Sequence, residues 1–331
     1  EVNAKGISID AVKEYQVLLA PFDVRQGNFG GLLLNAVTKS GTNDLRGSAY
    51  YFFRDQYFGK DTNTVNGTVF DRTQWGFTVG GPIIKDKLHF FIAPEFTAEN
   101  TPVTGPYQGQ PVGATPRFAF GMPAGCPDVA PTPPITCQTY IDTITRFDTA
   151  MARIMTQAGS QYTGTLGNPG YSNIPNPLSN LFARIDYQLN SLHRLVLHYN
   201  YASGERLRQQ NSRGTATTVY TSNFHNFKNV KNAPVVQLFS NFKNGSFNEL
   251  FVGYNSWYNR RDPLTTFPQI RINTVNSVNG LSAIVAGADQ FSQGNELDTK
   301  TWEFTDNYTR PWRTHTLTVG TRNEKVWLRN L

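Results

Sequence analysis

The chain has 331 residues, of which 39% are hydrophobic and 13% aromatic, and it carries a formal net charge of +6. Its mean hydropathy is -0.41 and its isoelectric point is about 9.2. No stretch approaches the ~20 consecutive apolar residues of a membrane-spanning helix, which excludes a helical membrane protein. The basic residues are scattered along the chain rather than grouped in runs, which argues against a nucleic-acid partner.

The first 43 residues hold short elements separated by glycines. Residues 9–17 have apolar side chains at helical spacing and pass into a short strand over 14–19, which Ala20 and Pro21 end. A segment over 22–29 leads to Gly30 and Gly31, an apolar run over 32–37 and the turn Thr38-Lys39-Ser40-Gly41-Thr42. Glycine-rich turns occur in many β proteins, so these residues alone leave their role open.

From Leu45 onward, apolar and polar residues alternate, which predicts a series of half-buried strands. In one of them, Leu195, Leu197 and Tyr199 share a face, while Val196 and His198 share the other. The predicted strands are 45–53, 73–80, 88–97, 180–188, 194–201, 235–242, 247–258, 301–310 and 315–327.

The connections between these strands are alternately long and short. The long ones are 55–72, 98–178, 203–231 and 261–298, and the short ones are 81–87, 190–193, 243–246 and 311–314. Strict alternation, with about ten residues per strand, is typical of an outer-membrane barrel with short periplasmic turns and long external loops. The alternative, a soluble β-sandwich, has loops of similar length at both ends.

Large aromatic residues near the strand ends predict two girdles at the membrane interfaces. Those beside the long connections are Phe53, Trp75, Phe96, Tyr201, Tyr258, Trp302 and Trp327, and those beside the short turns are Phe242, Phe247 and Trp312. For any single residue the alternative is the general preference of aromatic side chains for strands.

Two stretches resemble TonB-dependent outer-membrane receptors, in particular their Oar-like branch. One runs from Gly30-Gly31 to Ser40-Gly41-Thr42-Asn43, and the other covers 76–91 and begins Gly76-Phe77-Thr78-Val79-Gly80-Gly81-Pro82. The resemblance implies an all-β, antiparallel, up-and-down membrane barrel, in which residues 44–331 form about nine of ~22 strands. It implies that residues 1–43 are the C-terminal part of a plug domain. The plug–barrel junction would then consist of Gly30, Gly31, Thr38, Lys39, Ser40, Gly41 and Thr42.

The resemblance also implies a function and a location. Receptors of this family lie in the outer membrane of Gram-negative-type bacteria, bind a large or scarce solute at the cell surface and move it across the outer membrane by TonB-coupled plug rearrangement, with the direction of transport open for the Oar-like branch. The implied partners are the TonB complex of the inner membrane, which would contact residues outside this chain, outer-membrane lipid, the barrel assembly machinery and a solute of unspecified identity. We therefore expect the chain to be part of a longer protein. The alternative is a plug-less outer-membrane adhesin or a passive porin-like barrel.

The residue patterns do not suggest an enzyme. The five histidines are widely separated and lack the spacing of a metal site: His89, His193, His198, His225 and His315. Neither a Gly-x-Ser-x-Gly nucleophile elbow nor a phosphate-binding loop of the form Gly-x-x-x-x-Gly-Lys occurs. We expect no enzymatic activity, no cofactor and no bound metal.

The longest connection, 98–178, carries the two cysteines of the chain, Cys126 and Cys137. Because barrels assemble in the oxidising periplasm, we expect a disulfide that closes a proline-rich hairpin, with two free thiols as the alternative.

The same connection contains a predicted amphipathic helix over 142–157, based on the spacing of Ile144, Phe147, Met151 and Ile154. Ordered connections of this length usually have a purpose, which suggests that 98–178 takes part in ligand capture. The alternative is a lid that only shields the barrel mouth.

Overall fold

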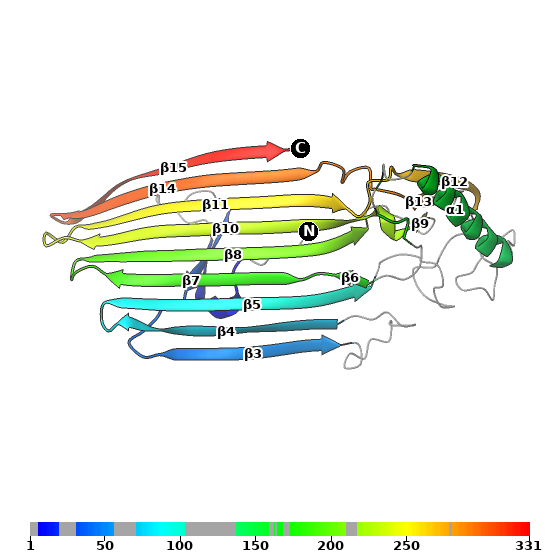
Figure 1. Ribbon diagram of the computed structural model, residues 1–331. Coiled ribbons are helices and arrows are strands. Elements are labelled where there is room, and N and C mark those ends of the chain that lie inside the picture. The colour runs from blue at the N-terminus through cyan, green and yellow to red at the C-terminus, as the bar shows by residue number, and fades with distance from the viewer. Residues whose placement is uncertain are drawn as a thin grey trace.

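One large antiparallel sheet dominates the protein. The computed structural model describes residues 6–19, 31–55, 71–102, 137–158, 162, 164–167, 173–209, 217–277 and 280–331. The sheet has ten strands in the order β15-β14-β11-β10-β8-β7-β5-β4-β3, and the short β6 lies beside β5 (Figure 1). The strands are β3 (Arg46–Asp55), β4 (Asp71–Ile84), β5 (Leu88–Pro102), β6 (Asn173–Pro175), β7 (Leu178–Gln188), β8 (His193–Gln209), β10 (Phe224–Asn241), β11 (Phe247–Pro263), β14 (Glu296–Trp312) and β15 (His315–Asn330).

The strands predicted from alternation are all present and pair in the predicted order. Short links at 85–87, 189–192, 242–246 and 313–314 join strand pairs at one end of the sheet, and the longer connections lie at the other end (Figure 1). The predicted all-β antiparallel fold is therefore confirmed. The sheet is curved but does not close on itself, and β3 and β15 form its two edges.

Two predicted connections, 203–231 and 261–298, are wrong in extent. β8 continues to Gln209, β10 begins at Phe224 and β11 continues to Pro263. These stretches are rich in asparagine and charged residues, so apolar and polar residues no longer alternate there, although the backbones remain paired. Side chains also form hydrogen bonds across the strands: Trp257 Nε1 donates to Asn229 Oδ1 at 2.8 Å. A strand needs ~9–11 residues to cross a membrane, and β10 with its 18 residues is longer than that.

The two faces of the sheet differ as the alternation predicts. Large apolar side chains cover the outer face, where Trp75 is 45% exposed and its ring lies 4.5 Å from that of Phe96. In β8, Leu197 on this face is 37% exposed, whereas the adjacent Val196 on the inner face is fully buried. Phe247 was predicted to belong to the aromatic girdle beside the short turns, and this prediction is wrong. It shares the inner face with Phe239, and their rings lie 6.5 Å apart, because its position in β11 alternates with those of the outer-face residues.

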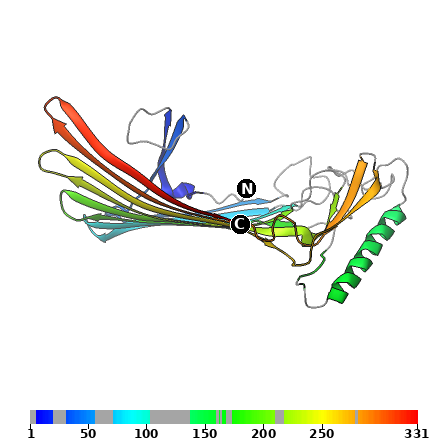
Figure 2. The ribbon, with the colours of Figure 1, turned by 90° about the horizontal axis from the view of Figure 1, so that it is seen from above.

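The N-terminal residues form a separate two-stranded hairpin. A short 3₁₀ turn, η1 (Ile9–Ala11), leads into β1 (Val12–Leu19), which pairs with β2 (Leu32–Thr38). The predicted strand over 14–19 is present. The helical conformation that the spacing over 9–17 suggested is limited to η1, because pairing with β2 begins at Val12. Figure 2 shows this hairpin standing on one side of the curved sheet. We call that side the inner face.

The long connections contain a further folded unit, which the sequence did not predict as such. It consists of α1 (Cys137–Ala158), β9 (Thr217–Val219), η3 (Thr221–Asn223), β12 (Ile270–Ser277) and β13 (Gly280–Ala286). β12, β13 and β9 form a three-stranded sheet beside α1 at the end of the large sheet where the long connections lie (Figure 2). We name this end the external end, after the general rule that the long loops of outer-membrane barrels are external. We call this unit the external cap. The Asn279-Gly280 pair is a hairpin signal that could have predicted β12 and β13.

No helix in the described parts of the chain combines the length and apolarity that a membrane crossing requires.

Candidate functional site

The N-terminal hairpin is held on the inner face by an arginine of the sheet. Arg184 donates to Asp186 from Nε at 2.7 Å and from Nη2 at 2.8 Å, and its Nη1 donates to Thr38 Oγ1 at 2.7 Å. The two bonds to Asp186 fix the planar guanidinium and leave its third nitrogen directed at the hairpin. Within the hairpin, the backbone N–H of Lys39 donates to the carbonyl of Ala11 at 2.8 Å.

A buried carboxylate forms the second contact. Glu95 is 2% exposed, and its Oε2 accepts hydrogen bonds from Ser8 Oγ at 3.2 Å and from Tyr50 Oη at 2.8 Å. Its Oε1 accepts from Asn180 Nδ2 at 3.4 Å. Beside it, Ala11 packs in an apolar cluster with residues of β5 and β7. Ser8 and Ala11 therefore hold η1 between polar and apolar side chains of the wall. We call these contacts, together with the hydrogen bond from Arg184 to Thr38, the hairpin seat.

The junction residues predicted from the resemblance lie at the base of the hairpin. Gly31 has a φ of +82°, which favours glycine, and Gly30 lies outside the described residues. A Cβ on Gly41 would lie 2.3 Å from the Phe90 carbonyl oxygen and 2.9 Å from that of Gly81. Glycine at position 41 thus allows the chain to pass close to the β4–β5 hairpin.

Asn43 fixes this crossing, and sequence reasoning gave it no such role. Its Oδ1 accepts hydrogen bonds from the Asp86 backbone N–H and lies within hydrogen-bond distance of His89 Nε2, both at 2.8 Å. Asp86 occupies the β4–β5 turn with a φ of +61°. Since 43 residues separate Asn43 from Asp86, no local pattern in the sequence reports the contact.

Three of the predicted junction residues line a common cavity. It has a volume of about 350 Å³, and Lys39, Ser40 and Thr42 lie on its wall together with Lys13 and Arg46. The cavity is bounded on one side by the hairpin and on the other by β3 and β4, so any displacement of the hairpin would change its shape. Arg46 is ion-paired with Asp44 at 3.1 Å, and both side chains are exposed.

At the opposite end, two connections that are far apart in sequence interlock in the external cap. β9 pairs in parallel with β13, and the Tyr220 N–H donates to the Val285 carbonyl at 2.9 Å. Asn223 Nδ2 donates to the Gly287 carbonyl at 2.9 Å, while the Gly287 N–H donates to Ser222 Oγ at 3.0 Å. The connections therefore form one unit rather than independent loops.

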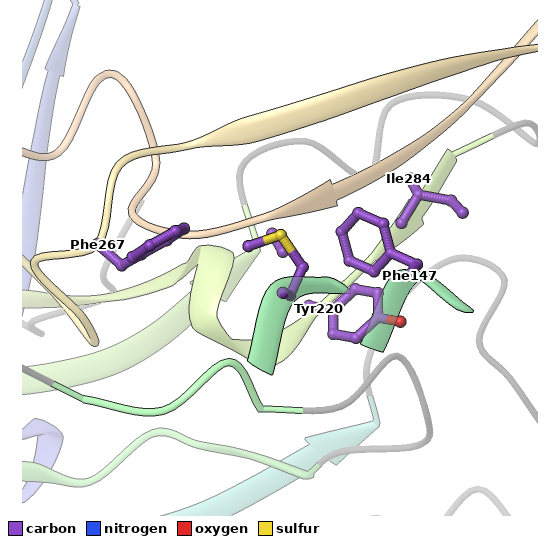
Figure 3. Close-up of a cluster of buried hydrophobic side chains, with 6 residues drawn as sticks. Phe147, Tyr220, Phe267 and Ile284 are labelled. Carbon is purple, nitrogen blue, oxygen red and sulfur yellow. The ribbon is translucent and has the colours of Figure 1, made fainter. Parts of the chain in front are cut away.

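The cap has its own apolar core, to which α1 contributes. Figure 3 shows Phe147 of α1 beside Tyr220 and Ile284, with ring centroids of Phe147 and Tyr220 5.0 Å apart. Met151 is 2% exposed, so the predicted amphipathic helix is confirmed, although it begins before residue 142. Ile154 was assigned to the apolar face and is 42% exposed, which shows that the buried stripe is narrower than its spacing suggested.

The predicted disulfide between Cys126 and Cys137 stays a prediction. Cys126 lies outside the described residues, and Cys137 is the first residue of α1. The proposed role of 98–178 in ligand capture likewise stays a prediction.

Buried polar side chains lie where the sheet meets the cap. His225, at the external end of β10, is fully buried, and neither of its ring nitrogens has a hydrogen-bond partner among the described residues. Burial lowers the pKa of His225 to about 4; the carboxylate of Asp289 opposes this shift, and the guanidinium groups of Arg261 and Arg208 add to it. Its imidazole is therefore neutral at ordinary pH. Among the residues that the structure describes, no group of three or more His, Cys, Asp and Glu side chains could hold a metal ion.

A curved antiparallel sheet with an apolar outer face, a polar inner face and connections of alternating length defines the wall of an outer-membrane β-barrel. A family model described as an outer membrane beta barrel domain matches residues 37–330. The chain belongs to this family and is located in the outer membrane.

Individual relatives are transporters and receptors. The chain is 34% identical over 107 residues to the TonB-dependent transporter Oar of Myxococcus xanthus, a match that covers 29% of this chain and 10% of Oar. Its fold is similar to the outer membrane transporter YddB of Escherichia coli, with a TM-score of 0.56, 10% identity, and coverage of 96% of this chain and 35% of YddB. It is also similar to a mutant of the ferric enterobactin receptor PfeA of Pseudomonas aeruginosa, with a TM-score of 0.51, 11% identity, and coverage of 96% and 36%. The chain thus spans about a tenth of Oar and about a third of each solved structure.

Proposed function

We propose that the chain is part of an Oar-like TonB-dependent receptor, which binds a large or scarce solute at the cell surface and moves it across the outer membrane. In this proposal, residues 1–43 are the end of the plug and residues 44–331 the first part of the barrel. The TonB complex of the inner membrane supplies the energy by displacing the plug. The other partners are the solute, outer-membrane lipid and the barrel assembly machinery, and the protein carries out no enzymatic reaction.

The observation that carries this proposal is the hairpin seat. A passive pore needs no element bound to its inner wall, whereas here Thr38 and Ser8 bind Arg184 and Glu95 of the sheet. The contacts are few and mostly polar, and a hydrogen bond to a charged group contributes about 1.5–3 kcal/mol net. Such a seat holds the hairpin in place and still lets a moderate force release it, as a transport cycle with a moving plug requires.

The external cap supports the surface-binding part of the proposal. Its core contains Phe147, Met151, Tyr220, Phe267 and Ile284, so the connections are ordered by their own packing. A preordered surface loses less conformational entropy when it grips a ligand than a set of independent loops would. The cap is therefore suited to capture a solute at the external mouth.

Conductance of the full-length protein in planar lipid bilayers tests the proposal against the passive porin alternative. We expect the unmodified protein to carry no steady ion current, because the plug occupies the lumen. A variant that lacks everything up to residue 43 should conduct. A steady current through the unmodified protein would favour the passive porin.

TonB coupling needs its own measurement. The purified periplasmic domain of TonB should bind full-length protein in a pull-down, and a variant without its N-terminal segment should not bind. Equal recovery of both proteins, or of neither, would contradict energy coupling through the plug.

A further inference from the structure

Basic side chains gather on the inner face of the sheet near its external end. Asn200 of β8 donates a hydrogen bond to the carbonyl of Gly6, which identifies its face as the inner one. Arg206 lies farther along the same strand with the same alternation, so it shares this face. In the strand register, Arg206 lies opposite Phe227 of β10, and Phe227 lies opposite Arg261 of β11. Two arginines thus flank one phenylalanine across three strands.

A third cation lies lower on the same face. Lys231 of β10 is paired in register with Ala202 of β8 and Trp257 of β11. With strands ~4.8 Å apart and ~3.3 Å of rise per residue, the backbones of Arg206 and Arg261 are ~10 Å apart and Lys231 is ~13 Å below Phe227. We call Arg206, Lys231 and Arg261 the inner basic cluster. All three side chains are partly buried.

The three cations of the cluster form no ion pair within the part of the chain that the structure describes. None of the ion pairs found among the described residues includes Arg206, Lys231 or Arg261. On the three strands that carry the cluster, the inner positions above the level of Asn200 hold no aspartate or glutamate. The carboxylate of Asp289 acts on the neighbouring His225, but it is not ion-paired with any of the three cations, which are therefore able to attract an anion.

Cations on the outer face at the same level are arranged differently. Lys228 pairs with Asp262 at 3.1 Å, and Lys300 pairs with Asp298 at 3.1 Å. Arg260 pairs with Asp262 and, at 3.6 Å, with Glu296. The outward cations Lys228, Arg260 and Lys300 are thus ion-paired, whereas the three cations of the inner cluster form no ion pair with a described residue, which distinguishes the cluster from an ordinary basic surface.

The neighbouring side chains suit a bound anion. The guanidinium of Arg208 lies 4.7 Å from the ring centroid of Phe227, and the Trp257 indole donates to Asn229 at 2.8 Å. In the strand register Phe227 lies between Arg206 and Arg261, and Trp257 lies beside Lys231, so aromatic residues alternate with the cations across this face. His225, fully buried with no partner for its ring nitrogens among the described residues, lies next to this group in the register, opposite Arg208.

We propose that the inner basic cluster is a binding site for a multiply charged anionic solute, one that bears several carboxylate or phosphate groups. The inference rests on the proposed receptor function and names the class of solute that the receptor takes. Arg206 and Arg261 bind oxyanion groups through paired N–H donors, and Lys231 binds a further charge deeper in the lumen. A concave wall with cations of one sign also raises the local concentration of anions and so speeds their capture.

The test is a titration of full-length, detergent-purified protein with inorganic tripolyphosphate as the probe, followed by calorimetry. The variant combines Arg206→Gln, Lys231→Gln and Arg261→Gln. The matched control combines Lys228→Gln, Arg260→Gln and Lys300→Gln, which removes the same charge from the outer face. We expect the dissociation constant to rise at least tenfold in the inner variant and to change less than twofold in the control.

Salt provides a second readout, since contacts between cations and an anion weaken as ionic strength rises. The affinity of the unmodified protein should fall with added salt, and that of the inner variant should hardly change. Should the triple variant fail to fold, single Arg206→Gln is measured, with an expected rise of at least threefold. Absence of tripolyphosphate binding to the unmodified protein, or equal losses in the inner and outer variants, would overturn the inference.

The TonB pull-down separates the two hypotheses. Binding of the TonB domain to both variants with no tripolyphosphate binding to the unmodified protein would overturn the anion site alone. If the unmodified protein does not bind the TonB domain, the proposal of an energy-coupled receptor is rejected instead.

Discussion

Replacement of Phe147 by alanine tests whether the external cap is one cooperative unit. Phe147 is 5% exposed and its ring lies 5.0 Å from that of Tyr220, so the change removes a buried ring from the centre of the cap core. Truncations of buried phenylalanine cost about 3–5 kcal/mol. Because α1 contributes Phe147 and Met151 to this core, most of that cost falls on the docking of the helix. A cost of about 3 kcal/mol raises the population of the undocked helix by more than ~100-fold.

Hydrogen exchange of full-length protein in lipid measures the effect segment by segment. Faster exchange is expected in η3 and β13, which lie far from α1 in sequence, with unchanged exchange in β7 and β8. Ile154→Ala is the matched control, because Ile154 lies on the same helix and is 42% exposed. If both variants behave alike, or if only α1 exchanges faster, the connections are independent loops and the reasoning fails.

Three further predictions address the wall, the junction and the region under the cap. Leu197→Arg on the outer face should cost about 2–4 kcal/mol in reversible unfolding in lipid, and Gln237→Arg on the inner face far less; similar costs would reverse the facing assignment. Gly41→Ala should destabilise by about 1–3 kcal/mol, because its Cβ would meet backbone oxygens, while Gly6→Ala, with nothing within 4 Å of its Cβ, should be neutral in the same measurement. Burial lowers the pKa of His225 from 6.5 to about 4. The unfolded state therefore binds a proton first, and the cap should lose up to about 3 kcal/mol as pH falls through this window. Hydrogen exchange of β10 should show that loss, and His225→Gln should abolish it.

The strands of the wall were predictable because lipid imposes a strict rule on them. A side chain that faces hydrocarbon must be apolar and its neighbour in sequence faces the opposite side, so alternation appears in each spanning segment. Leu197 and Val196 follow this rule, with the first partly exposed on the outer face and the second fully buried on the inner. Phe247 did not follow it, since large aromatic residues also pack on the inner face, where Phe247 stacks on Phe239.

Outside the bilayer that rule no longer applies, and the prediction failed there. β10 begins at Phe224, although the sequence from Asn226 to Asn232 shows no apolar alternation. Water can face both sides of these strands, and their stability comes from backbone pairing and from cross-strand contacts such as Lys228 to Asp262. Such contacts depend on register, which composition does not encode.

The hairpin seat was beyond prediction for a different reason. Arg184 and Asp186 were visible as a charged pair on one strand face, but Thr38 lies 146 residues from Arg184. Glu95 and Ser8 are 87 residues apart. The resemblance assigned Gly41 and its neighbours to a plug–barrel junction, which stays a prediction; the structure shows that the chain passes close to Phe90 and Gly81 at Gly41.

Strand β8 runs from the neighbourhood of the hairpin seat to the inner basic cluster, and this geometry limits how the two candidate sites could communicate. β8 contacts the hairpin segment through Asn200 and carries Arg206 toward the external end. Six residues of strand separate these positions by ~20 Å, too far for one small anion at the inner basic cluster to touch the hairpin seat. A solute that bridged both would have to be large, whereas a smaller solute could act on the seat only through movement of the wall or of other plug residues. If a small probe such as tripolyphosphate changes the amide hydrogen exchange at Ser8, the inner basic cluster therefore acts on the hairpin seat by an indirect route.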